Sequence, residues 1–212
     1  MGRLRVNIAM SLDGFTAGPD QSEEDPLGKG GMRLHEWAFA LAAFRDEHEQ
    51  EGGDVNASTP VIEEATANVG AYIMGRNMFG GRGLWGDPAW NGWWGDNPPY
   101  HTPVFVLTHH AREPRAMEGG TTFHFVTDGI ESAYERACEA AGEKDIVIGG
   151  GAQTVQQSLA AGLLDELQIN LVPILLGDGT RLLDGLATDT VLECTRVVEA
   201  PGVTHLRYRV VR

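Results

Sequence analysis

Residues 146–159, IVIGGGAQTVQQSL, constrain the fold of this chain more than any other stretch. The β-branched run at their start predicts a buried strand that stops at three successive glycines. Helical spacing follows, with Val155, Leu159 and Leu163 four residues apart. A strand, a turn without side chains and a helix N-terminus together favour a bound phosphate, because the backbone N–H groups there are unpaired and accessible. The alternative is a tight turn with no ligand, since glycine simply permits positive φ.

Bulk composition is that of a soluble globular domain that does not bind nucleic acid. No linker, repeat or low-complexity block divides residues 1–212, so we expect one domain. The formal net charge of −14 argues against a nucleic-acid partner, which requires a basic face. Cys138 and Cys194 lack metal spacing and predict no disulfide framework. With no signal-peptide pattern and no apolar run of about 18 residues, we expect a cytoplasmic protein without a membrane partner.

Apolar periodicity places further strands and helices along the chain. Strands are expected at residues 4–11, 71–74, 104–107, 123–126 and 167–176, the last with Pro173 at a bulge or an edge position. Helices are expected over residues 34–51, from Ser58 through Val69, and over residues 130–138. Residues 191–199 and 203–211 form a predicted closing hairpin. Strands alternating with helices before an antiparallel end predict an α/β fold, a mixed sheet covered by helices on both faces.

Five predicted strands end in small or polar residues, namely SLDG, GR, THH, TD and GGG. In open α/β sheets, ligands bind outside the carboxyl ends of the strands. Arg76, directly after Gly75, can grip a phosphate bidentately, and with Thr108 and His109 it would select NADP over NAD by its 2′-phosphate. The alternative for Arg76 is a surface arginine that pairs with one of the thirty acidic residues.

Several common catalytic motifs are missing from the sequence. No GK[ST] follows the glycines and their spacing is not GxGxxG, so neither a P-loop nor a Rossmann fingerprint is present. His109 and His110 have no third ligand at a defined spacing, so we expect no metal site. No G-x-S-x-G elbow occurs, and nothing supports a hydrolase.

Four tryptophans gather in the turn-rich residues 84–100, among them Trp85, Trp93 and Trp94. Their rings could stack on a flat heterocycle as the wall of a substrate pocket, or form a subunit interface. A lid that packs on its own core is the third interpretation.

The chain resembles the dihydrofolate reductase-like superfamily, and within it the stand-alone relatives of the riboflavin-biosynthesis reductase domain (the RibD C-terminal domain). The resemblance rests on motifs that occur in family order over nearly the whole chain. These are MSLDG at residues 10–14, MGRNMF at 74–79, VFVLTHH at 104–110, IGGGAQT at 148–154 and DELQINLVPILLGDG at 165–179.

The resemblance implies a three-layer α/β/α sandwich with a mixed, mainly parallel sheet, NADPH as the hydride donor and a homodimer. It also implies roles for particular residues, which follow by position. The 2′-phosphate would be flanked by Gly75, Arg76, Thr108 and His109. The pyrophosphate would be held by Gly149, Gly150, Gly151, Ala152, Gln153 and Thr154. The nicotinamide would be bordered by Ala9, Ile148 and the SLDG turn, and the adenine would lie near Thr127.

Two departures from the family bear on chemistry. The bifunctional riboflavin enzymes carry a zinc deaminase domain with H-x-E and P-C-x-x-C signatures, which two isolated cysteines exclude here. Folate reductases place a carboxylate on the first long helix. Glu36 is its possible counterpart, with a solvent-facing position as the alternative. Asp13 is the other candidate catalytic group, and an Asx-type turn cap is its alternative.

We therefore expect an NADPH-dependent reductase that acts on a small heterocycle of pyrimidine, pterin or ribosylamino-pyrimidine type. In such enzymes the cofactor supplies the chemistry, while the protein orients it and stabilises developing charge. Two alternatives remain, a true dihydrofolate reductase and a dinucleotide-binding protein without turnover. The tryptophan-rich segment and the terminal hairpin are the candidate contact surfaces of a dimer.

Overall fold

The computed structural model describes residues 2–48, 50–80, 90, 92–186 and 190–211. Eleven strands occur within these ranges: β1 (Leu4–Ser11), β2 (Phe15–Ala17), β3 (Val69–Gly75), β4 (Pro103–Leu107), β5 (Arg115–Ala116), β6 (Thr122–Val126), β7 (Asp145–Gly150), β8 (Glu166–Val172), β9 (Thr180–Arg181), β10 (Val191–Ala200) and β11 (Val203–Val211). The α-helices are α1 (Glu36–Phe39), α2 (Ala42–Glu47), α3 (Thr59–Thr66), α4 (Arg76–Gly80), α5 (Ile130–Ala141) and α6 (Ala152–Ala160).

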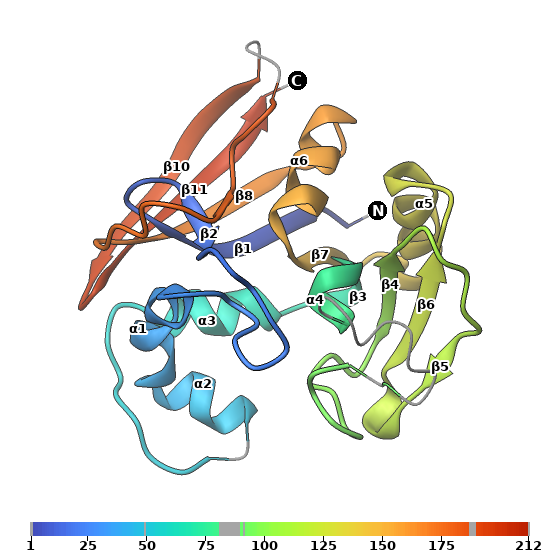
Figure 1. The fold of residues 1–212 in the computed structure, drawn as a ribbon, viewed down its shortest axis with the longest axis horizontal. Coiled ribbons are helices and arrows are strands. Elements are labelled where there is room, and N and C mark those ends of the chain that lie inside the picture. Colours follow the sequence, from blue (N-terminus) through green and yellow to red (C-terminus); the bar gives the residue numbers. More distant parts are fainter. Residues whose placement is uncertain (1, 49, 81–89, 91, 187–189, 212) are drawn as a thin grey trace.

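Nine of the described strands form one sheet in the order β10–β11–β8–β1–β7–β3–β4–β6–β5 (Figure 1). The run from β8 to β6 is parallel, whereas β11 is antiparallel to β8, β10 to β11 and β5 to β6. This confirms the expected mixed, mainly parallel sheet with an antiparallel hairpin at its C-terminal end. Because the six central strands point the same way, their carboxyl ends share one edge of the sheet.

Helices cover both faces of this sheet, as expected (Figure 1). Side chains alternate along β7: Ile146 and Ile148 pack with α5 and α6, while Val147 packs with Phe79 of α4 on the opposite face. Strands buried on both faces become nearly continuous apolar runs, which is why residues 146–148 stand out in the sequence. Helix α5 approaches β3 so closely that a Cβ on Gly70 would lie 2.7 Å from the Ala141 Cα.

The expected helix over residues 34–51 is wrong, because the chain breaks in its middle. A 3-10 turn (Gly31–Leu34) precedes α1, and α2 starts only after Leu41, whose backbone is extended at φ −80 and ψ 138. The backbone groups freed by the break bond to Asp54: its carbonyl accepts from the Ala42 N–H at 2.9 Å, and its N–H donates to the Ala40 carbonyl at 2.7 Å. A tertiary partner therefore overrides the helical spacing of the apolar residues.

Two predicted helices extend too far in sequence. Helix α6 ends at Ala160, and Leu163 lies beyond it. The N–H groups of Gly162 and Leu163 donate to the carbonyls of Leu159 and Ser158, which is a Schellman ending. Leu163 then packs back on the same core and so continues the apolar stripe without being helical. Val69, placed in a helix by its spacing, is the first residue of β3.

Two strand boundaries along the candidate ligand edge differ from expectation. Strand β7 continues through Gly149 and Gly150 rather than stopping at Ile148. Strand β8 stops at Val172, before Pro173, and lies in the interior of the sheet rather than at an edge. Proline has no N–H to donate to a ladder, so an interior strand ends before it.

The sheet face under α3 is polar rather than apolar. Arg5 of β1 donates to the Glu64 and Ala67 carbonyls near the end of α3, at 2.8 and 2.5 Å. Its guanidinium also lies 3.2 Å from the Asp145 carboxylate. The carboxylate of Glu64 binds Arg196 at 2.8 Å and Arg207 at 2.5 Å. Arg5 and Asp145 are nearly buried, and charges that are paired in this way remain compatible with a folded core, whereas the Glu64 cluster is partly exposed.

His205 on β11 is the most deeply buried titratable ring of this polar layer, at 1% exposure. It lies between the Ser58 hydroxyl, the Asn170 amide oxygen and the edge of Trp37. Burial, together with the nearby charge of Arg196, lowers the pKa of His205 from 6.5 to about 4. The ring is therefore neutral in the folded protein at neutral pH.

This burial predicts a loss of stability in mild acid. As the pH falls from 6.5 to about 4, His205 becomes protonated in the unfolded chain but stays neutral in the folded chain. The free energy of unfolding therefore decreases over this interval. The shift corresponds to about 3 kcal/mol for the full interval. Denaturant unfolding at several pH values should show a shallower acid slope for His205→Gln than for the wild type. Exposed His48→Gln should keep the wild-type slope, and equal slopes for all three proteins would contradict the account.

Candidate functional site

The triple glycine and the Gly75–Arg76 pair, 74 residues apart in sequence, meet at the carboxyl edge of the sheet. Strands β3 and β7 are neighbours, and Met74 lies opposite Gly150 in their register. A Cβ on Gly75 would lie 3.0 Å from the Thr154 Oγ1 and 3.8 Å from the Gly151 nitrogen. The two segments that the sequence assigns to one phosphorylated ligand are therefore adjacent.

The glycine turn leaves the N-terminus of α6 open. Gly150 has φ +127, a conformation that favours glycine, and a Cβ there would lie 3.4 Å from the Met78 sulfur. Gly151 is the N-cap of α6 and no side chain caps the helix. Among the described residues, nothing lies within 4 Å of a Cβ built on Gly151. The first N–H groups of a helix have no intrahelical partner, so this turn presents donors beside open space.

Arg76 is the first residue of α4 and is half-buried. Within the part of the chain that the structure describes, its guanidinium has no ion-pair or hydrogen-bond partner. Gly75 lies opposite Leu107 of β4, so the next strand end along the edge is Thr108. Among the described residues, this guanidinium without a partner stands beside an uncapped helix, and in a protein of net charge −14 the pair provides a local positive potential that suits an anion.

Thr108 and Thr127 continue the same edge beyond Arg76. The Thr108 N–H donates to the Val126 carbonyl at 3.0 Å, and the Thr108 hydroxyl accepts from the His110 N–H at 3.1 Å. This turn leaves His109 exposed. Thr127, directly after β6, is also exposed. Neighbouring strands are about 4.8 Å apart, so the ends of β7, β3, β4 and β6 span about 14 Å, enough for an extended nucleotide.

Ala9 and Ile148 differ in what they can offer a ligand. Ala9 lies on the α1–α3 face of β1, opposite Asn170 of β8, and is 6% exposed. The Ile148 side chain is 1% exposed and packs into the core under α5 and α6. Only the backbone of Ile148 can therefore border a bound ring.

Asp13 ties the SLDG turn to the segment after β8. Its carboxylate accepts from the Ser11 hydroxyl at 2.6 Å, the Gly177 N–H at 2.7 Å and the Leu176 N–H at 3.2 Å. The bond from Ser11, followed by those from Gly177 and Leu176, lowers the pKa of Asp13 from 3.8 to about 2. The group is thus ionised and occupied at neutral pH, and its contacts are those of the turn-capping alternative.

Glu36 opens α1 on the face of the sheet that carries Ala9. Its side chain is exposed, and in the described residues it makes no hydrogen bond or ion pair. Its neighbour Trp37 turns inward against His205, with ring centroids 5.0 Å apart. The solvent-facing alternative for Glu36 matches this position.

The tryptophans stand apart from the β1 end of the edge. Trp85 lies outside the described residues. Trp94 stacks on Phe123 of β6 at 6.3 Å, and Trp93 meets Trp90 edge-on at 4.9 Å. Because β6 is four strands from β1, Trp94 lies far from Ala9. Of the three interpretations, a segment packed on its own core describes the contacts of Trp94.

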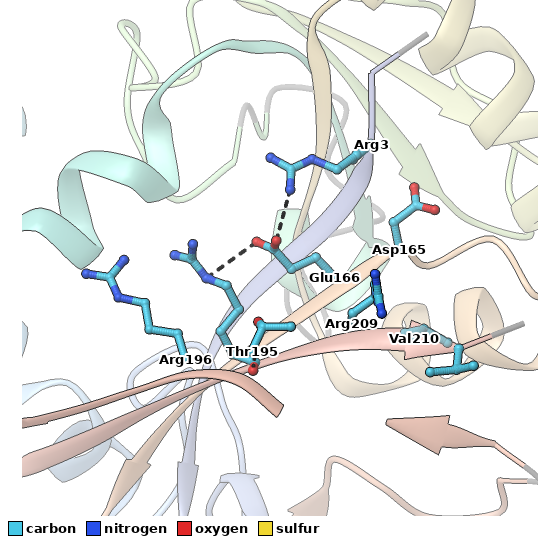
Figure 2. Close-up of a pocket in the computed structure, with 9 residues that line it drawn as sticks. Arg3, Asp165, Glu166, Thr195, Arg196, Arg209 and Val210 are labelled. Atoms are coloured by element: carbon cyan, nitrogen blue, oxygen red, sulfur yellow. Dashed lines mark hydrogen bonds and ion pairs between the residues drawn. The ribbon is translucent and has the colours of Figure 1, made fainter. Parts of the chain in front are cut away.

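A groove of about 760 Å³ lies at the opposite edge of the sheet, where β1 and β8 begin (Figure 2). Its arginines are matched by carboxylates: Arg3 lies 3.0 Å from Glu166, and Arg207 lies 3.6 Å from the same group. Arg207 also pairs with Glu64, as does Arg196, and Arg209 pairs with Glu193, so every arginine of the groove has a carboxylate partner. The groove therefore has neither the open donors nor the unpaired guanidinium that mark the glycine edge.

The described ranges contain neither a candidate metal site nor a helix that could span a membrane. No group of three or more His, Cys, Asp or Glu side chains there could hold a metal ion. No described helix has the length and apolarity needed to cross a bilayer. Both cysteines are free, Cys138 partly buried on α5 and Cys194 exposed on β10.

Sequence comparison assigns the chain to a family. The model of the RibD C-terminal domain matches residues 3–206. The chain belongs to the RibD C-terminal domain family. This confirms the resemblance inferred from the motifs. No curated protein matches the sequence.

Solved structures share the α/β fold. A putative riboflavin biosynthesis protein from Shewanella sp. PV-4 is 24% identical over 99% of both chains, with a TM-score of 0.63. A diaminohydroxyphosphoribosylaminopyrimidine deaminase/5-amino-6-(5-phosphoribosylamino)uracil reductase from Thermotoga maritima is 12% identical over 99% of this chain and 57% of that one, with a TM-score of 0.57. A dihydrofolate reductase from Enterococcus faecalis, complexed with NADP(H) and RAB-propyl, is 15% identical over 99% and 96%, with a TM-score of 0.51.

The contacts of Asp13 predict a defined effect on the loop that it holds. Asp13→Ala removes the acceptor for the Leu176 and Gly177 amides, so both should exchange with deuterium faster than in the wild type. Asp184→Ala is the matched control, because Asp184 bonds only the adjacent Gly185 amide among these loop contacts. Unchanged exchange at Leu176 and Gly177 in Asp13→Ala would show that the carboxylate does not hold the loop.

Proposed function

We propose that this protein is an NADPH-dependent reductase that acts on a small pyrimidine-, pterin- or ribosylamino-pyrimidine-like heterocycle. The RibD C-terminal domain family is a reductase family, which supports the reaction class. The observation that carries the cofactor assignment is the junction of Gly75 and Arg76 with Gly151 and the N-terminus of α6. A similar fold is complexed with NADP(H) in the Enterococcus dihydrofolate reductase, which supports the same cofactor class here.

The residues at the glycine edge fit a phosphorylated dinucleotide. Open space at Gly151, an uncapped α6 and the unpaired Arg76 guanidinium are the features that a diphosphate and a further phosphate require. In the proposed arrangement the roles follow the order of the strand ends. The pyrophosphate is held by Gly149, Gly150, Gly151, Ala152, Gln153 and Thr154. The 2′-phosphate is surrounded by Gly75, Arg76, Thr108 and His109. The adenine lies by Thr127, and the nicotinamide is bordered by Ala9, the Ile148 backbone and the SLDG turn.

The bound cofactor would supply the hydride, and this chain's own residues would orient the two reactants. Asp13 acts as a positioning residue, because it fixes the SLDG turn through Ser11 and Gly177 while remaining ionised. Glu36, on the Ala9 face, stays the candidate for handling the substrate proton. Trp93 and Trp94 are not assigned to the substrate pocket, since Trp94 packs on β6.

The proposal extends to a cytoplasmic homodimer. Edge strand β10 leaves one side unpaired and exposes Val191 and Val197 at 57% and 60%. The unpaired N–H and C=O groups of an edge strand are a template for pairing with another chain. Sedimentation at micromolar concentration measures the oligomeric state, and a species of twice the chain mass would support the dimer.

Arg76→Ala tests the cofactor assignment. Loss of a charge-assisted contact to the 2′-phosphate should weaken NADPH binding about 10- to 100-fold and leave NADH binding nearly unchanged. Fluorescence titration with both nucleotides gives the two dissociation constants. Exposed Arg115→Ala on β5 is the matched control and should leave both unchanged. Equal losses for NADPH and NADH in Arg76→Ala would remove the 2′-phosphate assignment.

Turnover separates the remaining alternatives. NADPH oxidation is followed with dihydrofolate and with aminopyrimidine substrates, including ribosylamino-uracil compounds. Oxidation with the aminopyrimidines supports the proposal, whereas oxidation with dihydrofolate alone identifies a folate reductase. NADPH binding without oxidation across the panel identifies a binding protein without turnover, for which the exposed position of Glu36 would account.

A further inference from the structure

Four polar side chains form a continuous hydrogen-bonded chain across the sheet face that carries Ala9. Ser58, just before α3, bonds His205 of β11 at 2.8 Å, and His205 bonds Asn170 of β8 at 2.7 Å. Asn170 in turn bonds Asn7 of β1 at 2.5 Å. Ser58, His205 and Asn170 are 1%, 1% and 4% exposed, whereas Asn7 is only half-buried. Of these four hydrogen-bonded side chains, only Asn7 therefore reaches accessible surface.

The chemistry of His205 sets the direction of this chain. The ring is neutral at neutral pH because burial and Arg196 lower its pKa, so one ring nitrogen donates and the other accepts. Nδ1 faces the Asn170 Oδ1, which can only accept, so Nδ1 carries the proton. Nε2 then accepts from the Ser58 hydroxyl.

The donor and acceptor roles of the two His205 nitrogens determine the roles of the Asn170 and Asn7 amides. The Asn170 Oδ1 faces His205, which leaves its Nδ2, a donor only, to face and donate to the Oδ1 of Asn7. The Asn7 oxygen thus already accepts one hydrogen bond, and the Asn7 Nδ2 carries two N–H groups. No acceptor for these N–H groups is present in the ranges that the structure describes. The series of hydrogen bonds therefore ends in the N–H donors of the Asn7 side chain.

Asn7 lies at the place where a substrate of the proposed reductase would bind. It is two residues before Ala9 on the same face of β1, and residues i and i+2 of a strand are about 7 Å apart. That separation matches the reach of one heterocyclic ring with its exocyclic oxygen. Trp37 of α1 covers His205 and keeps the inner part of the chain dry.

We infer that the Asn7 amide donates a hydrogen bond to a ring carbonyl oxygen of the substrate, and that Ser58, His205 and Asn170 position it. The inference rests on the proposed function, which places the substrate beside Ala9. Asn7 then determines specificity: it accepts heterocycles that present an oxo edge and rejects those that present an amino edge. A donor facing a donor leaves both unpaired, and discrimination by unpaired polar groups is strong.

Matched heterocycles test the inference without turnover. 5,6-Diaminouracil presents two ring carbonyls, and 2,4,5,6-tetraaminopyrimidine replaces both with amino groups. Calorimetry with the protein saturated with NADP⁺ should show at least about tenfold tighter binding of the uracil. Asn7→Leu should abolish this preference, and Asn7→Asp should invert it, because a carboxylate only accepts. Thr204→Val, next to His205 but on the other sheet face, is the control and should retain the preference.

The positioning role has its own readout. In ¹⁵N spectra the Asn7 side-chain amide should give one sharp, slowly exchanging pair of signals that shifts on addition of 5,6-diaminouracil. His205→Leu should broaden this pair and reduce the preference, while His205→Gln, which can still donate and accept, should restore both in part. Denaturant unfolding confirms that each variant is folded. Unchanged Asn7 signals in His205→Leu would overturn the positioning role.

Failure of this inference is distinct from failure of the proposed function. If the wild type binds NADP⁺ but binds both heterocycles equally or not at all, the Asn7 assignment is overturned and the reductase stands. The same holds if Asn7→Leu retains the preference. If NADP⁺ does not bind, the reductase proposal fails, and titration of the heterocycles without nucleotide decides the Asn7 assignment by the same preference.

Discussion

The parallel pairing of β3 with β7 is the constraint on which the site depends. It places Met74 opposite Gly150 and so brings the start of α4 against the turn into α6. Each segment alone is ordinary, one a strand followed by an arginine, the other a strand followed by glycines. Together they join a guanidinium that has no partner among the described residues to an uncapped helix at one edge. The other parallel strands then extend this edge toward Thr108 and Thr127 on one side and the SLDG turn on the other.

The two faces of the sheet have different roles, one in stability and the other in recognition. Under α5 and α6 the face is apolar and holds the large core that makes the central strands rigid. Opposite, the face changes from the apolar cluster around Phe79 to the polar layer around Glu64 and His205. Buried polar networks stabilise only when every member is satisfied. Here Ser58, His205 and Asn170 are linked by hydrogen bonds, and among the described residues the Asn7 side-chain N–H groups have no acceptor. The same network thus supports α3 and presents a recognition group.

Local signals in the sequence were sufficient for most strands and for the glycine edge. The β-branched run at residues 146–148 predicts β7 because a strand covered on both faces is apolar throughout, and parallel strand ends must share an edge. Long-range partners could not be predicted. The helix break at Leu41 depends on Asp54, and Asp13 is held by Gly177, 164 residues away in sequence. The polar chain joins Ser58 to a histidine 147 residues away, and no spacing rule identifies such a pair.

We propose that a phosphorylated nucleotide occupies the open space at Gly151. Gly151→Ala tests it most directly, because φ −99 and ψ −164 suit alanine and the added Cβ meets no described atom within 4 Å. Thermal unfolding and NADPH calorimetry are measured on the same variant. The account predicts an unchanged midpoint with affinity lowered at least about tenfold, since the methyl group takes the place of ligand atoms. An unchanged midpoint with full NADPH affinity would contradict it.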